Sequence, residues 1–179
     1  MKNKTSLTKD AILKDPYNYT LKEMKDCLGE EMATDFFESL YKYKPKIQNL
    51  TVKIKEVFNG KDTLKYAFEL SDGYCIETVC IKRKTGITVC VSTMVGCPVG
   101  CIFCASGKNG FIRNLSSSEI VQQIVLLKEK VNRIVFMGMG EPLLNYGEVI
   151  KAIHILRDRD GLNFPTDRIT ISTVGPIKK

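Results

Sequence analysis

The sequence is poor in histidine, has no long apolar run and lacks a second pair of closely spaced cysteines. His154 is the single histidine among 179 residues. No apolar run approaches the roughly 20 residues that a membrane-spanning helix needs. Structural zinc usually takes two ligand pairs such as CxxC, and the chain offers one pair, Cys101 with Cys104. These absences argue against a membrane span and disfavour structural zinc.

Cysteine usage bears on the cellular compartment. The seven cysteines are odd in number, and the first residues carry no signal-peptide pattern. Disulfide frameworks are typical of short secreted chains with paired cysteines, so we expect reduced thiols and a cytoplasmic location. A hydrophobic content of 44% indicates a globular chain with one ordinary domain and a small appendage.

The chain is moderately basic, with 27 Lys and Arg against 20 Asp and Glu and a net charge of +7. A basic group beside a phosphate releases condensed counterions, so this excess favours a polyanionic partner. Charge alone does not establish one, since many basic proteins bind no nucleic acid. The run Lys82-Arg83-Lys84 is either a charged hairpin end or a contact for RNA phosphates.

Cys97, Cys101 and Cys104 lie in the segment CPVGCIFC at a CxxxCxxC spacing. Three thiolates so close in sequence suit a cubane iron-sulfur cluster in which one iron has no protein ligand. The other interpretations are zinc, thiol redox chemistry and plain buried cysteine. We favour the cluster because a fourth protein ligand is missing.

This motif, with Phe103 before its last cysteine, resembles that of the radical S-adenosylmethionine (radical SAM) superfamily. The longer run from Cys90 to Cys97 and the segment 110–115 are similar to the dual-specificity RNA methyltransferase family, which methylates an adenine in 23S rRNA and in tRNA. The resemblance implies a [4Fe-4S] cluster on Cys97, Cys101 and Cys104, with S-adenosyl-L-methionine as cosubstrate. It also implies 23S rRNA and tRNA as partners, a flavodoxin- or ferredoxin-type electron donor, no membrane partner, and a monomer when full length.

Residues 1–48 predict an amino-terminal helical accessory domain. Residues 1 to about 15 lack apolar periodicity and indicate a loose arm. Thr20 with Glu23 reads as a capping box at the start of one helix, and a second helix is predicted from Met32 to Tyr43.

Residues 49–86 predict an antiparallel β-meander, because apolar and polar residues alternate between turn signals. The predicted third strand, Tyr74 to Ile81, places Glu77 on the same face as Cys75 and Val79. If that face is buried, the pKa of Glu77 rises and the carboxyl suits proton transfer. If the face is solvated, Glu77 is an ordinary surface charge.

From Ile87 onward strands and helices alternate, which predicts a parallel sheet of βα units. The predicted strands are Ile87–Ser92, Arg133–Met137 and Arg168–Thr173, and the helices run from Ser116 to about Lys130 and from Tyr146 to about Arg159. Ser116 with Glu119 reads as a capping box at the start of the first helix, and His154 lies on the polar, exposed side of the second. The fold class is therefore α/β. The resemblance implies that residues 87–179 are the amino-terminal half of a radical SAM partial (βα)6 TIM-like barrel.

The segment Gly138-Met139-Gly140-Glu141-Pro142 follows the second of these strands, where glycines let backbone approach a ligand. It resembles the GGEP-type motif that holds the amino group of S-adenosylmethionine, with Gly140 and Glu141 in the matching positions. By the same resemblance, Ser172 contacts the methionine moiety.

Two further roles come from the resemblance. Glu77-Thr78-Val79 matches a segment whose glutamate is the proton acceptor, and Cys90 matches a cysteine that helps to release the protein-RNA adduct. The cysteine that carries the methyl group near the family's carboxyl terminus has no counterpart here. We therefore expect this chain, which stops after the third strand, to be inactive alone.

Two alternatives stay open at this point. One is a non-catalytic RNA-binding module in which the thiols hold a metal or a cluster. The other is a radical SAM enzyme that methylates carbon 8 of adenine, although Gly-Glu-Pro at 140–142 leans towards carbon 2.

Overall fold

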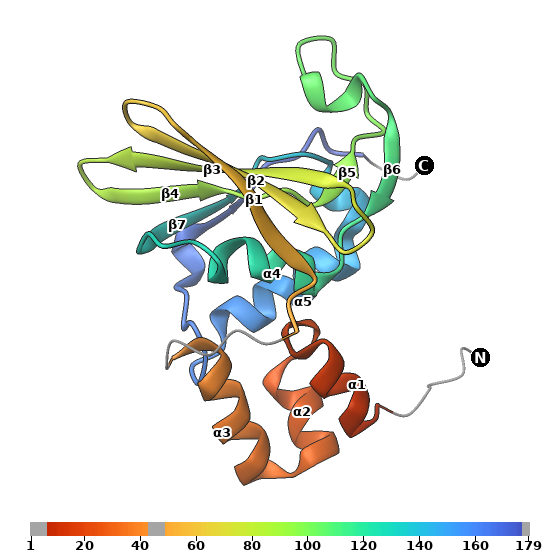
Figure 1. The fold of residues 1–179 in the computed structure, drawn as a ribbon, viewed down its shortest axis with the longest axis vertical. Helices are drawn as coiled ribbons and strands as arrows, with labels where there is room; N and C mark the ends of the chain where they lie inside the picture. Colours follow the sequence, from red (N-terminus) through yellow and green to blue (C-terminus); the bar gives the residue numbers. More distant parts are fainter. Residues whose placement is uncertain (1–6, 43–48, 177–179) are drawn as a thin grey trace.

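The computed structural model describes residues 7–42 and 49–176. Six of the described strands form one sheet. In Figure 1 helices α4 and α5 lie beneath this sheet, and the short helices α1 to α3 form a bundle at the amino-terminal end. Within the described ranges no helix is long and apolar enough to cross a bilayer.

The amino-terminal unit consists of α1 (Lys9–Lys14), η1 (Pro16–Asn18), α2 (Leu21–Leu28) and α3 (Glu30–Tyr41). The predicted capping box is confirmed: Thr20 accepts from the Glu23 backbone at 3.2 Å, and the Thr20 N–H donates to the Glu23 carboxylate at 2.8 Å. α3 begins two residues before the predicted start at Met32, and the predicted end at Tyr43 lies outside the described residues.

The prediction of a loose arm up to residue 15 is wrong for α1. The Thr8 side chain caps this helix by accepting from the Ala11 N–H, and Ile12 is fully buried. A helix of six residues is too short to show periodicity, and one buried side chain anchors it instead.

One mixed sheet contains both the meander and the βα strands, in the order β1-β2-β3-β4-β7-β8. The antiparallel part is β1 (Val52–Asn59), β2 (Thr63–Leu70), β3 (Cys75–Arg83) and β4 (Gly86–Cys90), and the parallel part continues with β7 (Val131–Phe136) and β8 (Ile169–Ile171). β4 is thus antiparallel to β3 and parallel to β7. This arrangement matches the predicted α/β class, but the sheet is open over the described residues and no closed barrel is seen there.

α4 (Ser117–Val125) and α5 (Tyr146–Arg157) share a buried cluster with one face of the sheet, which includes Ile76, Val89 and Ile134. The predicted capping box at Ser116 and Glu119 is confirmed. α4 ends at Val125 and not near Lys130, because its last turn tightens and the chain turns towards β7. His154 is exposed on α5, as predicted.

The opposite face of the sheet is more open. It carries Glu77, Val79, Thr88 and Cys90, which register places on one side: Val79 pairs with Cys90, and Cys90 pairs with Val135. Alternate strand residues point to opposite faces, so burial of Ile76, Thr78 and Cys80 leaves Glu77 on the side away from the helices.

Candidate functional site

The cysteine loop projects from a small two-stranded sheet, β5 (Met94–Gly96) with β6 (Phe111–Asn114), which the sequence did not reveal. The Cys97 N–H donates to the Gly110 carbonyl at 3.1 Å and closes the base of the loop. Gly96 has φ of +73°, and a Cβ there would collide with the same carbonyl. A glycine is therefore required where the chain enters the loop.

Cys97, Cys101 and Cys104 are half-buried free thiols. Backbone and side-chain hydrogen bonds from Ser106 lower the pKa of Cys104, which favours the thiolate, the ligand form. In residues 7–42 and 49–176, however, no three His, Cys, Asp or Glu side chains stand close enough together to hold a metal. The donor chemistry of the three thiols fits an iron-sulfur cluster, although in the described residues they are not assembled as a ligand set.

Two large apolar side chains of the loop face solvent. Ile102 is 99% exposed and Phe103 is 90% exposed. These two adjacent side chains give the loop an exposed apolar tip.

The strand after the loop is fixed by Arg113. Its guanidinium forms two 2.8 Å hydrogen bonds to the Glu119 carboxylate, and its Nε donates to Asp72 at 2.6 Å. These pairs tie β6 to α4 and to the turn between β2 and β3, and they raise the pKa of Arg113. No short sequence pattern indicated that Arg113 contacts both Glu119 and Asp72.

The loop 138–142 follows β7 and lies beside the end of β4. The Met139 carbonyl accepts from the backbone N–H groups of Thr93, at 2.8 Å, and Met94, at 3.2 Å. Gly140 has φ of +105°, and a Cβ there would lie 2.7 Å from Met94 and Thr93 side-chain atoms. Packing against Met94 and Thr93 therefore requires glycine at position 140, and the predicted approach of this backbone to a ligand stays a prediction.

Glu141 is 3% exposed, and its carboxylate accepts three hydrogen bonds. The donors are the Leu143 N–H at 3.0 Å, the Thr173 hydroxyl at 2.5 Å and the Val174 N–H at 3.0 Å. Burial raises the pKa of Glu141, but these bonds together outweigh it and leave the pKa below its ordinary value. The group is thus an anion at neutral pH, with about one of four acceptor positions unused.

Ser172 lies just after β8 and is exposed, and its N–H donates to the Phe136 carbonyl at 3.4 Å. The hydroxyl that reaches Glu141 belongs to the next residue, Thr173. The Ile-Ser-Thr segment therefore does lie at the Glu141 loop, and Thr173 is a neighbour that sequence reasoning missed.

Glu77 is not buried: its side chain is 52% exposed and pairs with Lys65 at 2.9 Å. The open face is therefore solvated at this position, and the alternative in which Glu77 is an ordinary surface charge holds for the chain as described. Glu77 does line a cavity of about 420 Å³ together with Cys75, Val95, Ala105, Ile112 and Met139. The cavity brings Glu77, the base of the cysteine loop and the 138–142 loop around one space.

Cys90, at the end of β4, is half-buried on the same face of the sheet. Burial raises the pKa of its thiol, and the positive charge of Arg83 offsets this only in part. Cys90 is therefore a neutral thiol at physiological pH. Among the described residues, neither Cys90 nor Glu141 lines the cavity beside Glu77.

A buried amide and a buried hydroxyl connect these segments. The Gln123 side chain accepts from the Thr78 hydroxyl and from the Ser92 N–H, both at 2.8 Å, and donates to the Ser92 carbonyl at 2.9 Å. Ser92 in turn accepts from the Met139 N–H at 2.9 Å. Sequence analysis missed both residues, because their partners lie 31 to 47 residues away.

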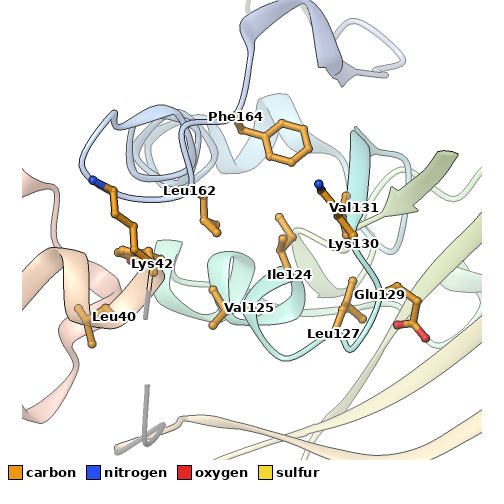
Figure 2. A pocket seen from close by; sticks show the side chains of 11 residues that line it. Leu40, Lys42, Ile124, Val125, Leu127, Glu129, Lys130, Val131, Leu162 and Phe164 are labelled. Carbon is orange, nitrogen blue, oxygen red and sulfur yellow. The ribbon is translucent and has the colours of Figure 1, made fainter. Parts of the chain in front are cut away.

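A second cavity, of about 610 Å³, lies elsewhere, between the ends of α3 and α4 and the segment after α5. Figure 2 shows Ile124, Val125 and Leu162 towards its middle, and the charged ends of Lys42 and Glu129 at its margin. Its lining, which is mostly apolar, contains no cysteine and none of the predicted site residues, so cavity size alone does not locate the site.

The family model described as "Radical SAM superfamily" matches residues 91–179. This part of the chain belongs to the radical SAM superfamily. The match begins at the end of β4 and includes the cysteine loop, the 138–142 loop and Ser172.

Named relatives agree with the superfamily match. A probable RNA methyltransferase of Rhodopseudomonas palustris is 60% identical over 65% of this chain and 32% of the relative. The probable dual-specificity RNA methyltransferase RlmN of Thermotoga maritima is 40% identical over 98% of this chain and 56% of the relative. The crystal structure of a radical SAM methyltransferase from Sphaerobacter thermophilus superposes with a TM-score of 0.82 at 32% identity, over 89% of this chain and 56% of that chain. The chain spans at most about half the length of these relatives.

Proposed function

We propose that this chain is the amino-terminal part of a radical SAM methyltransferase that methylates carbon 2 of an adenine in 23S rRNA and tRNA by way of a methylated cysteine. The observation that carries the proposal is the meeting of the cysteine loop and the Glu141 loop at the carboxyl ends of β4 and β7. Ligands bind at this edge in parallel α/β folds.

Each predicted site residue has a proposed role. Cys97, Cys101 and Cys104 hold the cluster, which supplies one-electron chemistry when bound. Glu141 uses its free acceptor position for the ammonium group of S-adenosylmethionine, while Gly140 and Ser172 bind the same molecule through backbone and hydroxyl.

Glu77 and Cys90 act on the RNA side of the reaction. Glu77 faces the cavity as an exposed carboxylate and takes a proton from the adenine adduct. Cys90 helps to release the adduct, and burial keeps its thiol protonated until that step. A methyl-carrying cysteine has no counterpart in the 179 residues, so we expect the chain alone to transfer no methyl group.

Anaerobic reconstitution with iron and sulfide tests the proposal. We expect about four irons and four sulfides per chain, with an absorbance band that changes when S-adenosylmethionine is added. Ala in place of Cys97, Cys101 or Cys104 should abolish the cluster, whereas Cys27→Ala, which removes a thiol of the amino-terminal unit, should not.

Two results would contradict the proposed function. Stoichiometric zinc, taken up when zinc and iron are offered together, would favour a structural-metal RNA-binding module. Methylation at carbon 8 by the chain extended with the carboxyl half of its Thermotoga maritima relative would retain the enzyme class and overturn the position.

A further inference from the structure

A polar cavity of about 240 Å³ lies at the end of the sheet where the parallel strands begin, opposite to the end that carries the cysteine loop. Its lining includes Thr85, Gly86, Asn132, Arg133 and Arg168. Gly86 begins β4, Asn132 and Arg133 are the second and third residues of β7, and Arg168 immediately precedes β8. The cavity thus sits at the amino ends of the parallel strands, whereas the candidate site follows their carboxyl ends.

The cavity is a built feature of the chain. The Asn132 side chain accepts from the Ile87 N–H at 2.8 Å, which fixes one wall. Gly86 has φ of +117°, and a Cβ there would collide with the Asn132 amide. Because glycine has no Cβ, Gly86 lets the two-residue turn of Lys84 and Thr85 lie against Asn132 of β7.

Positive charge exceeds negative charge at this cavity, whose lining holds two arginines and one aspartate. Arg133 and Arg168 are exposed, and over the described ranges neither forms an ion pair with an acidic side chain. Arg133 donates to the Asp167 backbone carbonyl at 3.2 Å, and the Asp167 side chain is the one carboxylate of the lining. Arg83 and Lys84 of the adjoining hairpin add two further cations.

We propose that this cavity binds a phosphate group, with the guanidinium groups of Arg133 and Arg168 as its charged donors and the hydroxyls of Thr85 and Thr88 as neutral ones. Arginine presents paired N–H donors that match phosphate oxygens, and threonine hydroxyls donate to the same acceptors. The group comes either from an RNA backbone or from free phosphate. This site is separate from the methyltransferase proposal, because none of its residues belongs to that site.

Hydrogen exchange of the chain at low concentration, with and without inorganic phosphate, locates the site. Phosphate should protect the peptides that contain Gly86 and Asn132 and leave the cysteine loop unchanged. The double variant Arg133→Gln with Arg168→Gln should weaken phosphate binding by about tenfold or more, because two charge-assisted hydrogen bonds are lost. Replacing both with Lys should restore binding in part, since charge returns without the forked geometry.

Arg157→Gln with Arg159→Gln is the matched control, because it removes the same charge from two exposed arginines outside the cavity.

Anisotropy of a labelled single-stranded RNA at several salt concentrations shows whether the bound phosphate comes from RNA or is free. The measured quantity is the slope of the logarithm of the binding constant against the logarithm of the salt concentration. If this slope becomes shallower by about 1.4 in the Arg133/Arg168 double variant alone, the cavity contacts two RNA phosphates, at about 0.7 for each. An unchanged slope with weakened phosphate binding indicates free phosphate. Equal losses in both double variants, or no protection by phosphate, would overturn the site.

Discussion

The Ser92 hydroxyl donates a 2.6 Å hydrogen bond to the backbone carbonyl of Glu77. The same oxygen accepts from the Met139 N–H at 2.9 Å, and Ser92 is fully buried. One hydroxyl therefore joins the strand of the proposed proton acceptor to the loop of the proposed cosubstrate site. A Cβ at Gly138 would lie 2.7 Å from Ser92, so loop and serine also pack tightly.

Ser92→Ala should loosen the 138–142 loop more than the rest of the chain. The substitution removes the acceptor of the Met139 N–H and the donor to the Glu77 carbonyl, two part-buried hydrogen bonds, which costs about 1–3 kcal/mol of unfolding free energy. Exchange of the Met139 amide should rise beyond what the global loss explains. Ser118→Ala is the control, because Ser118 is as buried and its hydroxyl bonds to Asp15 away from the site. Equal Met139 exchange in the two variants would show that Ser92 does not position the loop.

Glu141→Gln should destabilise the protein at neutral pH. Hydrogen bonds to a charged acceptor contribute about 1.5–3 kcal/mol, and the amide cannot accept from all three donors. Because the pKa of Glu141 is lowered in the fold from its ordinary 4.5, its stabilisation is present above 4.5 and is lost as pH falls through the lowered pKa. Urea unfolding of both proteins across this range should therefore converge at acid pH. A constant difference at every pH would exclude the carboxylate as the cause.

The same substitution tests the cosubstrate role. Loss of the anionic acceptor should weaken S-adenosylmethionine binding by about tenfold to a hundredfold in the reconstituted protein. Glu56→Gln removes an exposed carboxylate of β1 and should leave binding unchanged. Unaltered affinity in Glu141→Gln would refute the ammonium contact without affecting the stability argument.

Asp15 should make the fold less stable as pH rises, which is the opposite of the pH dependence expected for Glu141. Burial raises the pKa of Asp15 above its ordinary 3.8, the hydrogen bond from Ser118 and the charge of Lys151 lower it, and Glu119 raises it. An acid whose folded pKa is raised loses stability as pH rises from 3.8 through the raised value. Asp15→Asn keeps an acceptor for Ser118, so this loss should disappear in urea unfolding over that window. A wild-type curve that rises there as steeply as the variant curve would contradict the assignment.

Short sequence patterns predicted the features that depend on residues close together in the chain, such as helix caps. Thr20 with Glu23 and Ser116 with Glu119 cap helices as expected, since each pair spans a single turn. The roles of Ser92 and Gln123, by contrast, depend on partners up to 47 residues away, which no short pattern encodes. The exposure of Glu77 was left open for the same reason: alternation gives the face of a strand but not what covers that face.

The exposed edge of the sheet leads to a final prediction. β8 is an edge strand of the described sheet; its last residue, Ile171, is exposed, and Val174, three residues further on, is 59% exposed. Unpaired edge strands with apolar side chains recruit other chains. We expect the 179-residue chain to associate in sedimentation velocity as its concentration rises, and to methylate no RNA.

Thr170→Lys should reduce this association, because a charge on an edge strand disfavours pairing with another chain. Thr166→Lys adds the same charge at an exposed position before the strand and should have little effect. Adding the carboxyl half of the Thermotoga maritima relative as a separate chain should cover the edge and restore solubility before activity. If the chain is instead a cooperative monomer that methylates adenine unaided, both the open edge as an association site and the need for a further methyl-carrying cysteine are wrong.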